Sequence, residues 1–350
     1  MWAMVAKEFR QLRRDHRTLA MMIALPILLL VVFGYAANFD VHNIPTVVVG
    51  PGARASASLL RAPFHVVEVD RAGNQSTAEA CLRDGKAVVG LVTGDHGITV
   101  FIDGTQLFSA QTAESALAKA RVSEEAAGLA SLPVRVRVLF NPRLTTSWIM
   151  VPGLAGLILV FVGTLITSLG VVRERQAGTL EQLAVMPFRA WDVIAGKIAP
   201  YLIVALIDLI VILLIGMGIF HVPFRGNIAV FALGAALFLL VTLGLGVLIS
   251  TVSQNQGQAI QLAIMSLLPQ VLLSGFIFPV SSMAAGVRWI SYVLPLTYFV
   301  EISRGVMLKA TPISSLWGPI GLLALLGAAV FGLAIARFRR DLAPSTRVPQ

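Results

Sequence analysis

The sequence has little charge and almost no cysteine. Only 13% of its 350 residues are charged, compared with roughly 25% in a soluble domain. Cys81 is the single cysteine, so no intramolecular disulfide framework can form. Apolar residues make up 57% of the chain, and the mean hydropathy is +0.83. These values exclude a soluble enzyme, a disordered chain and a disulfide scaffold, and they predict that most of the chain lies in lipid.

Motifs for nucleotide binding and catalysis are also missing. The sequence contains no G-x-x-x-x-G-K-[ST], so we expect no ATP bound through a P-loop. H-E-x-x-H, G-x-S-x-G and clusters of Cys and His with metal-ligand spacing are absent too. The sequence therefore predicts a chain that is not an enzyme, with no catalytic, cofactor-binding or metal site.

Six apolar runs are long enough to cross a bilayer as helices, which takes about 20 residues. They are 19–37, 148–172, 198–220, 228–252, 259–280 and 317–336. A cleaved signal peptide is the alternative interpretation of the first run, because small residues follow it, but its basic leader and its apolar stretch are both too long. Six spans place both termini on the same side of the membrane.

The net charge of +9 lies beside the apolar runs. Residues 38–147 hold ten basic and ten acidic side chains and are neutral. If both termini are inside, thirteen Lys and Arg flank the inner ends of the spans and four flank the outer ends. The positive-inside rule therefore favours an N-in, C-in topology with residues 337–350 as a cytoplasmic tail. Basic residues placed in this way indicate a membrane protein and no nucleic-acid partner.

The two segments that flank the first run differ in character. Apolar side chains in residues 1–18 recur at helical spacing between basic ones, which predicts an amphipathic helix lying on membrane lipid. Residues 38–147 predict an extracytoplasmic α/β domain. Its expected strands are 44–49, 64–69, 88–92, 98–102 and 134–139, and its expected helices are 75–84 and 106–130. We expect a structural or docking role for this domain.

Polar side chains interrupt two of the spans. Asp208 lies near the middle of 198–220, where a charge costs about 3 kcal/mol on insertion scales and marks function by default. A hydrogen bond to a neighbouring helix is the structural alternative. Gln261 and Gln270 lie in 259–280, where they either hold helices together or line a polar path. These three residues are the candidates for a transport pathway.

The segment 281–316 is apolar only in pieces too short to span. Pro295 divides it, and aromatic residues are frequent on both sides. We expect two re-entrant or interfacial helices on the outer side, with an aromatic belt. Glu301 and Arg304 are three residues apart in the second helix, a spacing that predicts an ion pair.

The cytoplasmic loop 173–197 contains a second, short helical pattern. Thr179 begins a capping box, with Gln182 at the third helical position. Leu180 and Leu183 give this helix an apolar side. Such a helix either fits a groove on a soluble partner or is an interfacial turn with no partner.

This loop resembles the signature of a known family. From Arg173 it reads RERQAGTLEQLAVMPFRAWDVIAGK, which is similar to the EREx-GTLEQLLVTPLRPWELLxGK pattern of ABC type-2 permeases in the branch with a large outer domain after the first span. Met186 and Ala190 depart from it, where Thr and Pro are usual. Further stretches that resemble the family follow in order along nearly the whole chain. They are 140–142, 150–153, 222–226, 274–279, 294–299 and 304–305.

The resemblance implies a multi-pass permease subunit of an ATP-driven exporter in the bacterial inner membrane. Its partners would be a separate ABC ATPase, which binds ATP and Mg²⁺, and a second permease, either an identical copy or a paralogue. The expected activity is efflux of drugs or other amphipathic, lipid-like compounds, and the outer domain would guide substrate or dock an envelope partner. The residues implied to couple to the ATPase are Glu174, Arg175, Gly178, Thr179, Leu180, Glu181, Gln182 and Leu183.

The expected fold is an α-helical integral membrane protein with six transmembrane helices, an N-terminal interfacial amphipathic helix and an α/β extracytoplasmic domain. Two other functions remain alternatives. A membrane sensor with a ligand-binding outer domain would not need the capped inner helix or polar residues in several spans. An ion-coupled transporter that uses Asp208 predicts internal repeats of the spans, and no repeat is evident between the two halves.

Overall fold

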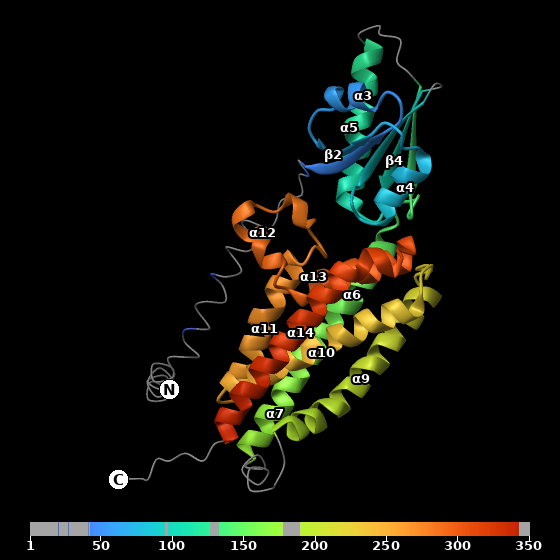
Figure 1. Ribbon diagram of the computed structural model, residues 1–350. Coiled ribbons are helices and arrows are strands. Elements are labelled where there is room, and N and C mark those ends of the chain that lie inside the picture. The colour runs from blue at the N-terminus through green and yellow to red at the C-terminus, as the bar shows by residue number, and fades with distance from the viewer. Residues whose placement is uncertain are drawn as a thin grey trace, which may run out of the picture.

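The computed structural model describes residues 20, 27, 41, 43–94, 97–126, 133–177 and 190–342. Figure 1 shows its two parts, an α/β domain above a bundle of long helices. The predicted interfacial helix 1–18 and nearly all of the predicted first span 19–37 lie outside the described residues.

The α/β domain is a five-stranded sheet with helices on its faces. Its elements are β1 (Ile44–Val49), α3 (Ala53–Leu59), β2 (Phe64–Asp70), α4 (Gln75–Arg83), β3 (Val89–Gly94), β4 (Gly97–Asp103), α5 (Leu107–Ala126) and β5 (Val134–Leu139). The strand order is β2-β1-β3-β4-β5. All neighbouring strands are parallel except β3 and β4, which form an antiparallel hairpin. The five predicted strands and both predicted helices are confirmed to within a few residues, whereas α3 was not predicted.

The burial of β1 fits its interior position in the sheet, between β2 and β3. Its residues are almost all buried on both faces, as is typical of a strand inside a parallel sheet. One face packs with alanines of α5, and the other packs with Ala78 and Leu82 of α4. Asn74 begins α4 with a capping box that includes Thr77, which satisfies backbone N–H groups that a helix start leaves free.

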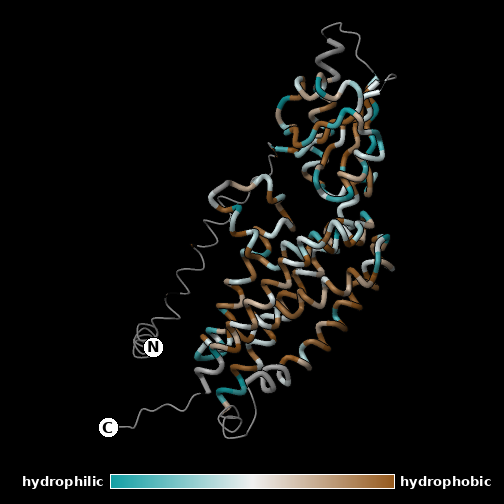
Figure 2. Tube along the Cα trace, in the orientation of Figure 1, coloured by the Kyte–Doolittle hydropathy of each residue, from teal (hydrophilic) through white to brown (hydrophobic). Residues whose placement is uncertain are grey.

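Among the described residues, the bundle consists of five long helices. They are a continuous apolar helix Thr146–Gln176, made of α6 (Thr146–Phe161), a π-helical turn (Val162–Ile166) and α7 (Thr167–Gln176), and then α9 (Ala190–Gly218), α10 (Ile228–Val252), α11 (Gln256–Leu273) and α14 (Ile313–Leu342). Within the described residues, four segments are long and apolar enough to cross a membrane: Thr146–Gln176, Ile198–Gly218, Ile228–Val252 and Ile313–Arg337. They correspond to the second, third, fourth and sixth predicted runs. Figure 2 shows the bundle as mostly hydrophobic, whereas the α/β domain mixes hydrophilic and hydrophobic residues.

One apolar run is shorter as a helix than predicted, and two helices extend beyond their predicted spans, whose bounds agree with the apolar segments Ile198–Gly218 and Ile313–Arg337. The run 259–280 ends as a helix at Leu273, because Gly275 turns the chain with a φ of +82°. The third helix begins at Ala190, inside the loop predicted as 173–197. The last helix continues to Leu342, beyond the start of the tail predicted at 337.

Helix α10 is the centre of the bundle. It packs along α14 and against α6, α7, α9, α11 and α13. Small residues allow this close approach: a Cβ at Gly246 would lie 2.8 Å from the backbone oxygen of Gly163. By contrast, α9 is peripheral and exposes most of its large apolar side chains, as expected for a helix that faces lipid.

Two short helices separate α11 from α14. They are α12 (Ala285–Ser291) and α13 (Pro295–Arg304), and a π-helical turn (Gly305–Lys309) follows. Pro295 is the first residue of α13, a position where its missing N–H costs nothing. Phe299 of α13 stacks on Phe238 of α10, with the ring centroids 4.4 Å apart. The segment predicted as re-entrant is therefore packed against the central helix at the α/β-domain end of the bundle (Figure 1).

Candidate functional site

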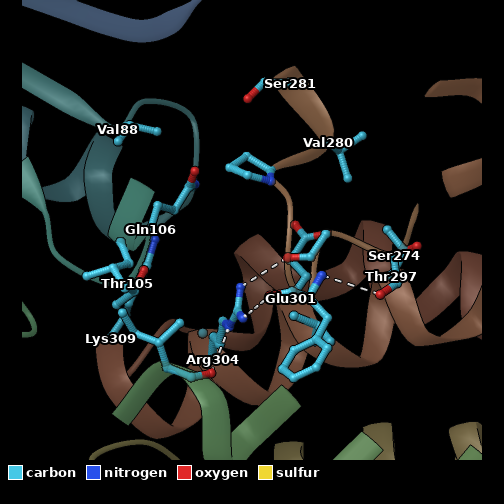
Figure 3. Close-up of a pocket in the computed structure, with 18 of the residues that line it drawn as sticks. Val88, Thr105, Gln106, Ser274, Val280, Ser281, Thr297, Glu301, Arg304 and Lys309 are labelled. Atoms are coloured by element: carbon cyan, nitrogen blue, oxygen red, sulfur yellow. Dashed lines mark hydrogen bonds between the residues drawn. The ribbon is translucent and has the colours of Figure 1, made fainter. Parts of the chain in front are cut away.

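A cavity of about 300 Å³ lies where the α/β domain meets the bundle (Figure 3). The α/β domain contributes Thr105 and Gln106, which follow β4, and the end of α4. The bundle contributes the start of α6, the turn after α11, and residues of α13 including Glu301 and Arg304. Segments far apart in the sequence thus line one cavity.

A buried ion pair forms one side of this junction. Lys309, in the turn after α13, pairs with the carboxylate of Asp103 at the end of β4. The Lys309 side chain is 8% exposed and that of Asp103 is 0% exposed. The ammonium also donates to the backbone oxygen of Leu82 at 3.1 Å, and Asp103 accepts from the backbone N–H and the hydroxyl of Thr105 at 2.9 and 2.7 Å. Both charges are therefore compensated where they are buried.

Further polar contacts fix the domain on the bundle. Thr311 donates to the backbone oxygen of Arg83 at 3.0 Å. Arg225, in the loop before α10, donates to the backbone oxygens of Phe140 and Leu308, both at 3.0 Å. Asn141 bonds to the backbone of both Gly104 and Thr145, next to the start of α6. Because these bonds come from several segments, the domain is held at more than one point.

Arg304 has a different partner from the predicted one. Its guanidinium donates to three backbone oxygens, those of Ile149, Gly275 and Phe276, at 3.4, 3.3 and 3.0 Å (Figure 3). No ion pair joins it to Glu301 within the described residues, so that prediction was wrong. The carbonyls at the start of α6 and after α11 attract the guanidinium instead. Burial lowers the pKa of Arg304 to about 10, and Asp103 acts in the opposite direction.

Glu301 lines the cavity with its side chain accessible from that space. It makes no hydrogen bond or ion pair with any described residue. The surrounding protein removes water from the carboxyl group, and this burial raises the pKa of Glu301, while Lys309 lowers it. The position of Glu301 in the outer segment 281–316 was predicted, but its role as a free carboxylate was not.

The predicted pathway residues do not meet in this site. Asp208 is half-buried on the peripheral helix α9, and none of Asp208, Gln261 and Gln270 lines the cavity. Gln270 is 2% exposed and Gln261 is half-buried; the side-chain oxygens of both glutamines are buried, with no hydrogen-bond donor among the described residues.

The structure places only the base of the predicted coupling segment. Residues 178–183 lie outside the described residues, whereas Glu174 and Arg175 lie in the last turn of α7. Arg175 donates to the backbone oxygens of Ser250 and Ser253 at 3.1 and 3.2 Å. These carbonyls are at the carboxyl end of α10, where a positive charge is favourable. The end of α7 is therefore tied to the central helix.

Sequence reasoning missed Lys309, Asp103 and Arg225. In the sequence analysis, Lys309 entered only the count of basic residues in the outer flanks, and Asp103 entered only the charge balance of residues 38–147. A signal was present, because Lys309 ends the otherwise apolar stretch 305–309 and Asp103 is the last residue of the partly buried strand β4. Nothing in the sequence indicated that the two would meet.

Known proteins are similar to this chain over almost its whole length. The family described as "ABC-2 family transporter protein" matches residues 16–336. The chain is 29% identical to the probable multidrug ABC transporter permease YbhR of Escherichia coli strain K12, over 98% of this chain and 99% of that protein. It is 28% identical to the probable multidrug ABC transporter permease YbhS of the same strain, over 87% and 88%. The inner membrane transport permease YhhJ of that strain is 31% identical over 64% of this chain and 59% of that protein.

Proposed function

Because the chain belongs to the ABC-2 family of transporter proteins, which confirms the resemblance seen in its inner loop, we propose that it exports amphipathic compounds in partnership with a separate ATPase. The single observation that carries this proposal is the similarity to permeases along nearly the full length of the chain. The chain is the permease subunit, and its sequence contains no P-loop. The energy would therefore come from ATP hydrolysed on another chain.

The proposed topology has six spans in the bacterial inner membrane, with both termini on its inner, cytoplasmic side. Four segments among the described residues support four of these spans. Helix α11 has 18 residues and rises about 27 Å, close to the roughly 30 Å of a hydrocarbon core. We count it as the fifth span and the apolar run 19–37 as the first. The α/β domain is then on the outer side.

Coupling would start at residues 178–183, the segment proposed to dock on the ATPase. Movement of this segment would pull on α7, and the bonds of Arg175 to the end of α10 would pass that movement to the central helix. The helices would then change their relative position as rigid bodies. A second permease chain, either identical or paralogous, completes the proposed transporter, and an envelope partner for the outer domain is a further part of the proposal.

The test replaces residues 178–183 with a flexible Gly/Ser linker in the tagged, full-length chain. We expect the ATPase that co-purifies with the unmodified chain to be lost. The matched control replaces residues 127–132, a stretch of equal length in the α/β part, and should retain the ATPase. Equal recovery of the ATPase with both variants would refute the coupling assignment.

A further inference from the structure

The cavity beneath the α/β domain has the size and lining of a small ligand site. Its volume of about 300 Å³ is at the lower end of the range for ligand pockets, roughly 300–1,000 Å³. On the bundle side, Ile149, Phe276 and Val300 contribute apolar surface. On the opposite side, Thr105 and Gln106 contribute polar groups (Figure 3). Such a space fits a molecule that is mostly apolar and has one polar end.

The charges on the lining single out one residue. Lys309 is paired with Asp103, and Arg304 donates to three backbone oxygens. Arg83 and Asp84 are adjacent residues of opposite sign at the end of α4. Glu301 has no hydrogen-bond or ion-pair partner among the described residues, and its side chain is exposed on the cavity lining. A carboxylate that faces the cavity without a partner presents a negative charge that a cationic ligand can compensate.

The geometry points to a binding site for amphipathic organic cations in this cavity, with Glu301 as the counter-ion. A charge-assisted contact to the carboxylate would satisfy Glu301, and the apolar part of the ligand would lie against α6 and α13. A neutral ligand would leave Glu301 unpaired, and an anion would be placed against a like charge. This inference rests on the proposed function and names the substrate class for it. The cavity lies at the α/β-domain end of the bundle, so the cation would occupy the release end of the pathway.

The test measures binding of two probes to the purified full-length chain in detergent. Tetraphenylphosphonium and tetraphenylborate have nearly the same size and shape but opposite charge. We expect only the cation to bind, and we expect Glu301→Gln to weaken its binding by about tenfold or more, because the Coulomb attraction between the cation and the carboxylate is lost. Glu79→Gln, which removes a carboxylate of α4 that does not line the cavity, should bind like the unmodified chain. No binding of the cation, equal binding of the anion, or unchanged binding by Glu301→Gln would overturn the proposal.

A second measurement locates the bound cation. Cys81 is buried, so Thr297→Cys introduces an accessible thiol on the cavity lining, one turn before Glu301. Tetraphenylphosphonium should slow maleimide labelling of this thiol, and the protection should disappear in Thr297→Cys/Glu301→Gln. Labelling at the same rate with and without the cation would place the ligand elsewhere and overturn the proposal. Neither assay needs the ATPase, so failure here leaves the proposed function to be decided by ATPase co-purification.

Discussion

The buried pair of Lys309 and Asp103 makes the sharpest prediction of stability. Lys309→Met removes the cation and leaves the carboxylate of Asp103, which is 0% exposed, with only its bonds to Thr105. Breaking a buried pair in this way costs about 3–5 kcal/mol. Asp103→Asn in the same chain removes the unpaired charge, so the double variant should recover part of that loss. The two residues should therefore show a clear coupling free energy in a double-mutant cycle.

The single cysteine provides the assay. Cys81 is in the core beside Leu82, whose backbone oxygen accepts from Lys309. Burial raises the pKa of the Cys81 thiol, so maleimide should label the folded chain slowly and mainly through opening of the α/β domain. A loss of about 3 kcal/mol increases that labelling rate roughly 100-fold. Lys119→Met, at an exposed position on α5, is the matched control and should have no effect. A change of less than about threefold for Lys309→Met would refute the argument that this pair stabilises the domain, since threefold corresponds to only about 0.65 kcal/mol.

The remaining predictions concern the bundle. Gly246→Ala should lower the thermal stability of the detergent-solubilised chain, because the new Cβ would lie 2.8 Å from the backbone oxygen of Gly163 and overpacking costs about 1–3 kcal/mol. Gly332→Ala, which meets nothing within 4 Å, is the control, and equal stability of the two variants would contradict this packing. Arg175→Gln should leave ATPase co-purification intact but reduce ATP-driven transport at least severalfold, because the link from α7 to Ser250 and Ser253 is lost; transport by reconstituted vesicles at the unmodified rate would exclude this role.

Local patterns predicted most of the elements. Runs of β-branched residues matched β1 to β5. Successive side chains of a strand point to opposite faces, so a strand buried on one face alternates apolar and polar residues, and a strand buried on both faces is apolar throughout. The apolar runs matched four of the long helices, because in lipid the backbone must form its own hydrogen bonds. Helix α3 was missed, since its sequence ARASASL has neither an apolar face nor a capping residue. The early end of α11 was missed because the positive φ of Gly275 depends on its surroundings.

The candidate site was predicted less well, and Arg304 shows why. Its spacing from Glu301 favours an ion pair on an isolated helix, yet carbonyls from α6 and the turn after α11 reach the guanidinium in the folded chain. Local spacing cannot anticipate a competitor that is distant in sequence. With Arg304 bonded to these carbonyls, Glu301 has no ion-pair partner among the described residues.

The sequence alone determined that this chain lies in a membrane, carries an α/β domain and belongs with ABC type-2 permeases, because hydropathy, periodicity and motifs are local properties. Only the tertiary structure decided that Lys309 meets Asp103 across 206 positions of sequence, and that Glu301 lines a cavity between domain and bundle with no partner in the part of the chain that the structure describes. The physical reason is that burial and charge compensation depend on which distant segments pack together, and no local pattern encodes those contacts.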